Sequence, residues 1–235
     1  MAIDLEGQLK QLKILAQLGL PYLSETWQDI LGIDAAVWTI DLGGTTGTVA
    51  RNIAEEPYQK VILGGPANSD EARLYTVASW QLAPDIWGLN TFIKALIMEW
   101  ECKFDTVASI DNAEFFMGLS AGAAAVRTSM NLAGFILTAD ALNAITDDGG
   151  AETVSAVGAP VITNWMKLKI VAYPACIEFW VNEVMQVRHT TTPAPDEDLP
   201  DVNAHGNFFT DADGVGGGTT ELHVATISIR PGVLL

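Results

Sequence analysis

The sequence predicts an all-β protein, an antiparallel β-sandwich with a short N-terminal helical arm. Residues 165–188 carry the clearest signal, because apolar and polar side chains alternate on both sides of a short break at Tyr173-Pro174. The apolar set is Met166, Leu168, Ile170 and Ala172, then Ile177, Phe179, Val181, Met185 and Val187. This pattern is typical of an antiparallel hairpin with one buried face. Nine or ten strand-like segments at intervals of roughly 8–20 residues, without helical patterns between them, favour a sandwich over βαβ units.

Composition limits the functional classes. Of 235 residues, 49% are hydrophobic and 17% charged, which is typical of a packed globular protein. The formal net charge of −17, with no Lys/Arg cluster, argues against nucleic acid as a partner. No apolar run reaches the ~18 residues of a membrane span. The first residues lack the layout of a secretory signal, so we expect synthesis in a cytoplasm.

Residues 1–42 are predicted to form the helical arm, and residues 43–235 the sandwich. Leu5, Leu9 and Leu12 recur at helical spacing until Gly19 and Pro21, and a second short helix is predicted over 24–31. The apolar stripe of the arm suits either packing against the sandwich or contact with a neighbouring subunit.

Further strands are predicted over 58–63, 73–82, 94–104, 114–119, 132–138 and 221–230. The segment 94–104 is the clearest of these. It places Leu96, Met98, Trp100, Cys102 and Phe104 on one face, and Ala95, Ile97, Glu99, Glu101 and Lys103 on the other. Residues 139–158, rich in Asp, Gly, Ala and Thr, are predicted to be a long surface loop.

Candidate catalytic groups are few. Glu99 and Glu101, at i and i+2 of one strand, share a face about 6–7 Å apart, a separation that a carboxylate pair of a glycosidase can use. The E-x-D-x-E pattern of retaining laminarinase-like enzymes is absent, and a polar sheet face explains both residues. Ser120, in G-L-S-A-G, lies between strands rather than at a strand–helix turn, so we do not expect a nucleophile.

Metal ligands are also scarce. His189, His205 and His223 lack ligand spacing, and Cys102 and Cys176 are expected to be buried reduced thiols. Asp211, Asp213 and the pair Asp147-Asp148 suit a solvated acidic loop better than a calcium site. We therefore expect no catalytic residue, no metal ion and no cofactor.

The order of segments resembles one family. IKALIMEWECKF, AEFFMGLSA and NLAGFIL precede the hairpin, and ELHVATISIRP closes the chain. Over about residues 70–232 this is similar to the concanavalin/laminin-G-like jelly roll, and more narrowly to such modules in tailed-phage virions. The same fold serves lectins, carbohydrate-binding modules and glycosidases.

The resemblance implies a virion structural protein rather than an enzyme. It would be a capsid decoration (cement) protein that binds the major capsid protein on the outside of a phage head, as a homo-oligomer with a trimer favoured. Leu5, Leu9, Leu12 and Trp180 would make partner contacts. The alternative is a lectin-like carbohydrate-binding module, in which Trp80, Trp87 and Trp180 would stack on a glycan.

Overall fold

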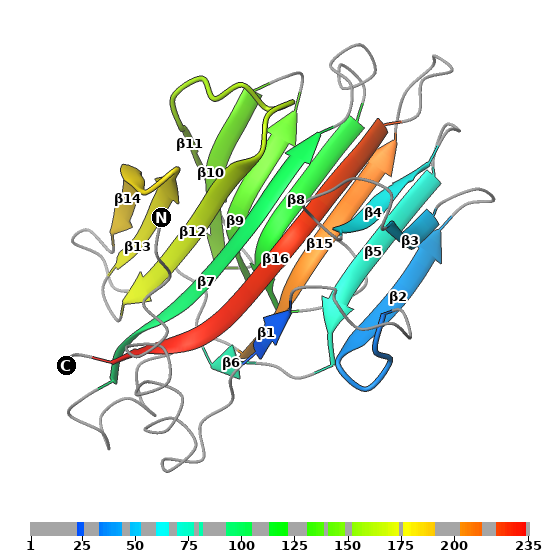
Figure 1. The fold of residues 1–235 in the computed structure, drawn as a ribbon. Coiled ribbons are helices and arrows are strands. Elements are labelled where there is room, and N and C mark those ends of the chain that lie inside the picture. Colours follow the sequence, from blue (N-terminus) through cyan, green and yellow to red (C-terminus); the bar gives the residue numbers. More distant parts are fainter. Residues whose placement is uncertain are drawn as a thin grey trace, which may run out of the picture.

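The computed structural model consists of two antiparallel β-sheets packed face to face, with long strands running side by side in each layer (Figure 1). Among the residues that it describes there are sixteen strands and no helix. These residues are 23–25, 33–43, 48–52, 60–65, 70–77, 80–81, 93–104, 113–121, 131–138, 141–148, 152–173, 176–190, 203–212 and 220–233. No helix in this part of the chain is long and apolar enough to cross a membrane.

The first sheet, called sheet A, has the order β14-β13-β12-β7-β16-β4-β3, with β1 also paired to β16. Its strands are β1 (Leu23–Glu25), β3 (Thr48–Asn52), β4 (Lys60–Gly65), β7 (Ile93–Phe104), β12 (Met166–Tyr173), β13 (Cys176–Val181), β14 (Val184–Thr190) and β16 (Thr220–Val233). The long strands β7 and β16 lie side by side at its centre (Figure 1).

The second sheet, called sheet B, has the order β11-β10-β9-β8-β15-β5-β2, with β6 paired to β15. Its strands are β2 (Trp38–Gly43), β5 (Asp70–Thr76), β6 (Trp80–Gln81), β8 (Ala113–Ser120), β9 (Asn131–Thr138), β10 (Ala141–Asp148), β11 (Glu152–Ala156) and β15 (Asn203–Ala212). The antiparallel sandwich predicted from the sequence is thus confirmed.

The core between the sheets is dominated by aromatic rings. Trp100 of β7 packs edge-on against Phe135 and Phe208, with ring centroids 5.8 Å apart in both pairs. Phe135 in turn meets Phe179 at 5.5 Å. These side chains are fully buried, and such aromatic pairs add roughly 0.5–1.5 kcal/mol each beyond their buried area. The rings therefore hold the centres of the two sheets together.

The hairpin predicted from residues 165–188 is confirmed in its first half and corrected in its second. Strands β12 and β13 pair with Tyr173 opposite Cys176, and Met166, Leu168 and Ile170 are buried as predicted. The chain then turns again at Asn182-Glu183, so β13 and β14 are separate strands. Met185 is exposed, although the sequence pattern predicts it on the buried face of one strand that continues from Val181.

Two other expectations are wrong. The predicted loop 139–158 contains β10 and β11, whose alternation is masked because small and polar residues such as Ala144 and Thr146 occupy the buried positions. The helix predicted over 24–31 is contradicted at its start, because residues 23–25 pair with β16 as strand β1. Sheet pairing there overrides local helical preference.

The helix predicted from Ile3 to Leu18 lies outside the described residues, so this part of the 1–42 arm stays a prediction. β2, which ends at Gly43, pairs with β5 within sheet B.

Candidate functional site

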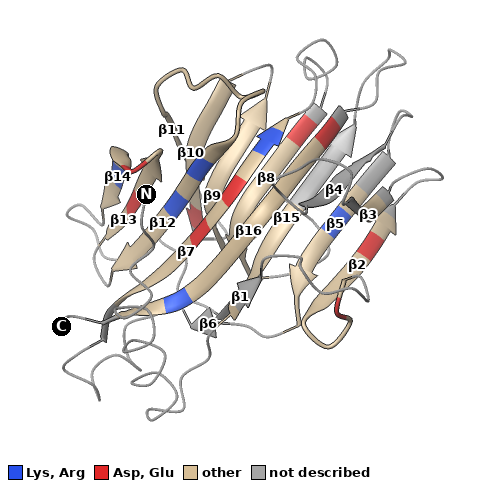
Figure 2. Cartoon of the chain, viewed as in Figure 1, with Lys and Arg blue, Asp and Glu red and all other residues tan. Residues whose placement is uncertain are grey.

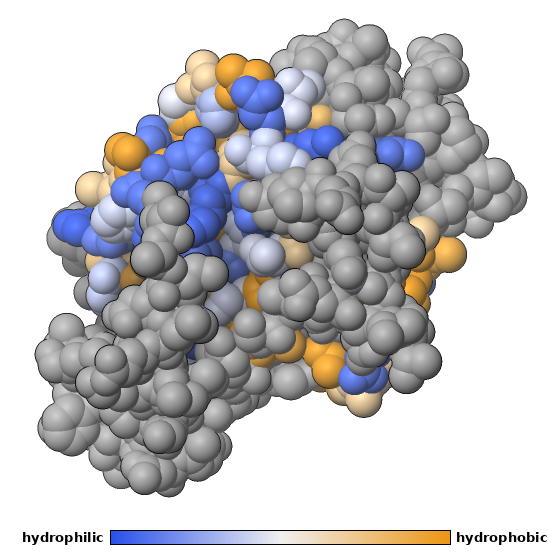
Figure 3. Space-filling model, in the orientation of Figure 1, coloured by the Kyte–Doolittle hydropathy of each residue, from blue (hydrophilic) through white to orange (hydrophobic). Residues whose placement is uncertain are grey.

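Many side chains of sheet A that point away from the core are polar or charged, and we call these residues together the polar face. It arises because strands alternate buried apolar with exposed polar residues. Charged residues of both signs lie on β7, β12, β13 and β16 (Figure 2), and hydrophilic residues gather over the same region (Figure 3). Its members are Glu99, Glu101, Lys103, Lys167, Lys169, Glu178, Trp180, Glu183, Arg188, Glu221, Thr226, Ser228 and Arg230.

Trp180 lies at the centre of the β13 side of the polar face. Strand register places it opposite Lys169, which is itself opposite Glu99. The Lys169 ammonium lies 4.5 Å from the centroid of the Trp180 ring, and the indole Nε1 donates a hydrogen bond of 3.2 Å to Glu178. The half-buried ring is therefore fixed by a cation above its plane and an acceptor at its edge.

Glu178 is a nearly buried carboxylate, with 8% of its side chain exposed. Arg188 of β14, directly opposite in register, donates from Nε at 3.1 Å and also pairs through Nη2. The hydrogen bond and the negative charge of Glu178 raise the pKa of Arg188. Glu178 therefore joins an exposed guanidinium to the indole, which fixes the orientation of Trp180.

Glu183 brings a second carboxylate to this part of the polar face. It lies in the two-residue turn between β13 and β14, and its Oε2 is 2.9 Å from the Lys169 ammonium and its Oε1 3.2 Å from that of Lys167. Hydrogen bonding to Lys169, the largest influence, lowers the pKa of Glu183. Partial burial opposes the charge on Lys167, but the Glu183 hydrogen bond and the Glu99 charge outweigh it, so its pKa is raised.

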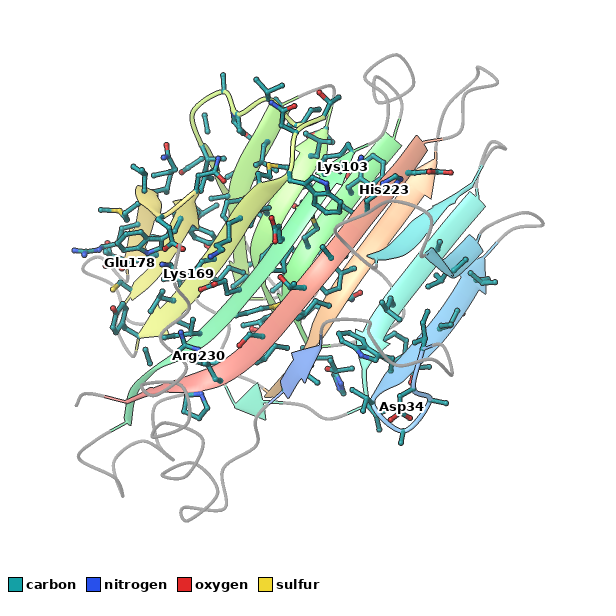
Figure 4. The ribbon with its side chains drawn as sticks, viewed as in Figure 1. Asp34, Lys103, Lys169, Glu178, His223 and Arg230 are labelled. Atoms are coloured by element: carbon teal, nitrogen blue, oxygen red, sulfur yellow. The ribbon has the colours of Figure 1, made fainter. Side chains whose placement is uncertain are left out.

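A second tryptophan–lysine pair lies farther along β12. The ammonium of Lys103 is 5.3 Å from the centroid of the Trp165 ring. Beside it on β16, His223 is nearly buried and meets Glu221 at 2.9 Å. Figure 4 shows the labelled Lys103 and His223 near one end of the face, and Lys169 and Glu178 farther along. Two aromatic rings are thus presented among charged groups on one surface.

The residues singled out in the sequence have different outcomes. Trp180 belongs to the polar face, and Glu99 and Glu101 lie on it as the alternation of β7 predicted. Lys167 approaches Glu99 at 3.6 Å. Leu5, Leu9, Leu12 and Trp87 lie outside the described residues, and the side chain of Trp80 is not described. The sequence analysis did not predict a role for Glu183. Asn182-Glu183 between two segments of alternating apolar and polar residues is a weak signal for a hairpin turn.

The other candidate groups have structural contacts. Ser120 is buried and accepts a 2.8 Å hydrogen bond from Asn207. Cys102 and Cys176 are both free, and burial raises the pKa of both thiols. No group of three potential metal ligands occurs within the described ranges. Asp147 is buried on β10. Asp213 lies outside the described residues.

The outer face of sheet B is different in character. Phe116, Leu132, Ile136 and Ile145 point away from the main core, yet they form a second buried apolar cluster with exposures of 0–2%. Gly118 and Gly134 face each other beside them in the β8–β9 pairing. The ring of Phe116 lies so close to Gly134 that a Cβ there would be 2.5 Å from it. Among the described residues, the outer side of sheet B therefore carries a buried apolar cluster, whereas the outer side of sheet A carries the charged residues of the polar face.

Comparison with known proteins shows the fold. No family model matches the sequence, and no curated protein matches it. A solved structure of a glycoside hydrolase family 16 protein of Bacteroides ovatus, in complex with a product of mixed-linkage glucan, superposes with a TM-score of 0.63 at 8% identity, covering 88% of this chain and 99% of that one. The β-glucanase of Bacillus licheniformis gives a TM-score of 0.56 at 10% identity, covering 89% and 97%.

A glycoside hydrolase family protein from Mycobacterium thermorestibile gives a TM-score of 0.62 at 13% identity, covering 88% and 99%. At these identities the comparisons show a shared concanavalin-like jelly-roll fold. They contradict the expectation of a capsid decoration protein that is not an enzyme, because these three similar structures are glycoside hydrolases. The error arose because one fold carries many functions, and fold resemblance alone had suggested the virion role.

Proposed function

We propose that this protein binds carbohydrate through the polar face. The observation that carries the proposal is the fixed indole of Trp180, which is held by Lys169 and Glu178 within a surface of hydrogen-bonding side chains. The glycoside hydrolases among the fold neighbours, one of them solved with a glucan product, support the same class of ligand. This is the alternative that the sequence left open.

The chemistry of a sugar ring fits this surface. A pyranose presents apolar C–H groups on its faces and hydroxyls around its rim. Sites for such ligands combine aromatic surface with a few fixed polar groups. Trp180 supplies the aromatic surface, and the ammonium of Lys169 and the half-exposed guanidinium of Arg188 supply donors. Because Lys169 lies over the indole and Arg188 is held by Glu178, less side-chain entropy is lost on binding.

A glycan array tests the proposal. The wild-type chain is expected to bind a defined subset of glycans. Trp180→Ala is expected to weaken that binding at least about tenfold, because truncation of a Trp at the centre of a binding site commonly costs about 2 kcal/mol or more. Val184→Ala is the matched control, because Val184 is exposed on the neighbouring strand and lies outside the polar face. Glycan binding that survives Trp180→Ala, or no binding at all, would refute the proposal.

Glycoside hydrolysis is a second candidate, favoured by the glycoside hydrolases among the fold neighbours. Glu99 and Glu101 lie on one face of β7. Residues two apart on a strand are about 6.4–6.8 Å apart, near the lower end of the roughly 6.5–9.5 Å between the carboxyl groups of inverting glycosidases. Release of reducing ends from mixed-linkage β-glucan should then fall at least about a hundredfold in both Glu99→Gln and Glu101→Gln. Wild-type protein that releases none would exclude this candidate.

A further inference from the structure

Glu183 occupies a backbone conformation that its side chain does not favour. Asn182 and Glu183 have φ angles of 49° and 66°, and they connect β13 to β14 with Val181 opposite Val184. Two-residue turns with positive φ at both positions prefer Asn followed by Gly. Asn182 suits its position, and its side chain accepts a 2.9 Å hydrogen bond from the Lys167 backbone N–H. Glu183 is strained, and strain of this kind points to a role for the side chain.

The carboxylate of Glu183 bridges two lysines that lie on the same face of β12. Each oxygen is taken by a different ammonium group, Oε1 by Lys167 and Oε2 by Lys169. The side chain of Glu183 is 57% exposed, compared with 42% for Lys167 and 19% for Lys169. An exposed anion thus lies on a more buried pair of cations, and solvent or a ligand can reach it.

We propose that Lys167 and Lys169 form a receptor for the carboxylate or sulfate group of an acidic sugar, and that Glu183 fills this receptor until such a sugar displaces it. The inference rests on the proposed carbohydrate binding and names its ligand class. Lys169 belongs to the receptor and also lies over the Trp180 ring, so a sugar whose anionic group replaces Glu183 has its ring beside the indole.

The local charge supports displacement. Lys167 and Lys169 are balanced by Glu183 and by Glu99, which lies 3.6 Å from the Lys167 ammonium. With the Glu183 carboxylate displaced, the group has one uncompensated positive charge, which a ligand anion neutralises. Surface ion pairs such as these contribute little individually and exchange readily. The turn holds Glu183 close by, so the internal carboxylate competes at a high effective concentration.

Methyl β-glucuronide and methyl β-glucoside are suitable probes, because they differ only in the carboxylate, and glucose 6-sulfate tests the sulfate group. Binding is followed by NMR of the side-chain signals of Lys167 and Lys169 in the full chain. Glu183→Gly removes the competing anion and suits the turn. Glu183→Gln removes the charge while it keeps the positive φ. Both variants are expected to bind at least one anionic sugar about three- to tenfold more tightly than the wild type.

Controls separate this inference from the proposed function. Methyl β-glucoside should bind equally to the wild type, Glu183→Gly and Glu183→Gln. Glu152→Gln should not increase affinity for the anionic sugars, and Lys169→Met in the Glu183→Gly background should abolish the gain. No gain in either Glu183 variant overturns the inference, even if Trp180-dependent binding of neutral glycans stands. If the Glu183 variants bind an anionic sugar more tightly and this increase depends on Lys169, while no glycan binds on the array, the inferred anion receptor stands and the proposed function is rejected.

Discussion

His189 joins the two sheets at one edge of the sandwich, and its replacement by alanine is expected to destabilise the protein strongly. The residue lies on β14, the edge strand of sheet A, and its ring is nearly buried. Its Nδ1 is hydrogen-bonded to the hydroxyl of Thr146 at 2.9 Å, and its Nε2 to that of Ser155 at 3.0 Å. Both partners belong to sheet B, on β10 and β11. The imidazole also packs on Phe179, with centroids 5.0 Å apart.

The expected cost follows from these contacts. His189→Ala leaves the fully buried hydroxyl of Thr146 without this partner, which costs roughly 1–3 kcal/mol. Loss of the ring against Phe179 adds a cavity worth about 1 kcal/mol or more. Ser155 is only half-buried, so water can replace its bond. The sum is about 2–4 kcal/mol of unfolding free energy.

Guanidinium chloride unfolding, followed by tryptophan fluorescence, measures this loss. Thr190→Ala is the matched control, since Thr190 is the next residue of β14 and is exposed; it should change stability by less than about 0.5 kcal/mol. Replacing both partners, in His189→Leu with Thr146→Val, should recover at least about 1 kcal/mol relative to His189→Ala. A loss below about 1 kcal/mol for His189→Ala would refute the bridging role.

Two further predictions concern Glu183 and Gly118. The pKa of Glu183 is lowered in the folded protein, so its charge adds stability above about pH 4.5 that is lost as the pH falls through the lowered pKa. In urea titrations, the stability difference between wild type and Glu183→Gln should therefore be nearly constant from about pH 7 to 5 and shrink progressively at lower pH. Gly118→Ala should cost about 2 kcal/mol or more in thermal denaturation, because its Cβ would lie 2.4 Å from the Ala133 carbonyl oxygen. Gly232→Ala, where the nearest atom is 3.2 Å away, should cost clearly less; equal costs would contradict this account.

The sequence pattern predicts a strand well when one of its faces is apolar and the other is polar or charged. The segment 94–104 alternates long apolar with charged residues, and β7 has the predicted faces, with Trp100 and Cys102 buried. β12 was equally clear, because lysines separate its buried residues. In both strands one sheet face meets the core and the other meets solvent, so the alternation in the sequence directly reflects burial.

Strands with two buried faces, or with small residues inside, could not be recognised in this way. β9 is buried at six consecutive positions, and β10 buries Ala144 and Thr146 on the core side while Ile145 and Asp147 are buried on the other. Residues 203–212 were not predicted as a strand, although Phe208 reaches the core, because polar residues flank it. Burial on the second side depends on chain segments distant in sequence, which local pattern does not contain.

The candidate site could be predicted only in part, for a related reason. Alternation placed Trp180 and Glu178 on the outward face of their strand, and this is where they lie. It could not show that Glu183 returns over β12 to reach Lys167 and Lys169, because that contact depends on a turn whose second residue is not the expected glycine.

The distribution of charge explains why this face, rather than another, would receive an acidic ligand. The chain carries a formal net charge of −17 with only 12 Lys and Arg, so most of its surface repels anions. On the polar face, Lys103, Lys167, Lys169, Arg188 and Arg230 balance Glu99, Glu101, Glu178, Glu183 and Glu221. An anionic sugar therefore meets long-range repulsion but a locally neutral face. Salt screens the former over about 8–10 Å and affects close, partly buried pairs less. The affinity of Glu183→Gly for glucuronide should accordingly fall little, or even rise, when the salt concentration is raised from about 20 to about 150 mM. A receptor made of uncompensated surface cations on a basic protein would instead lose affinity steeply.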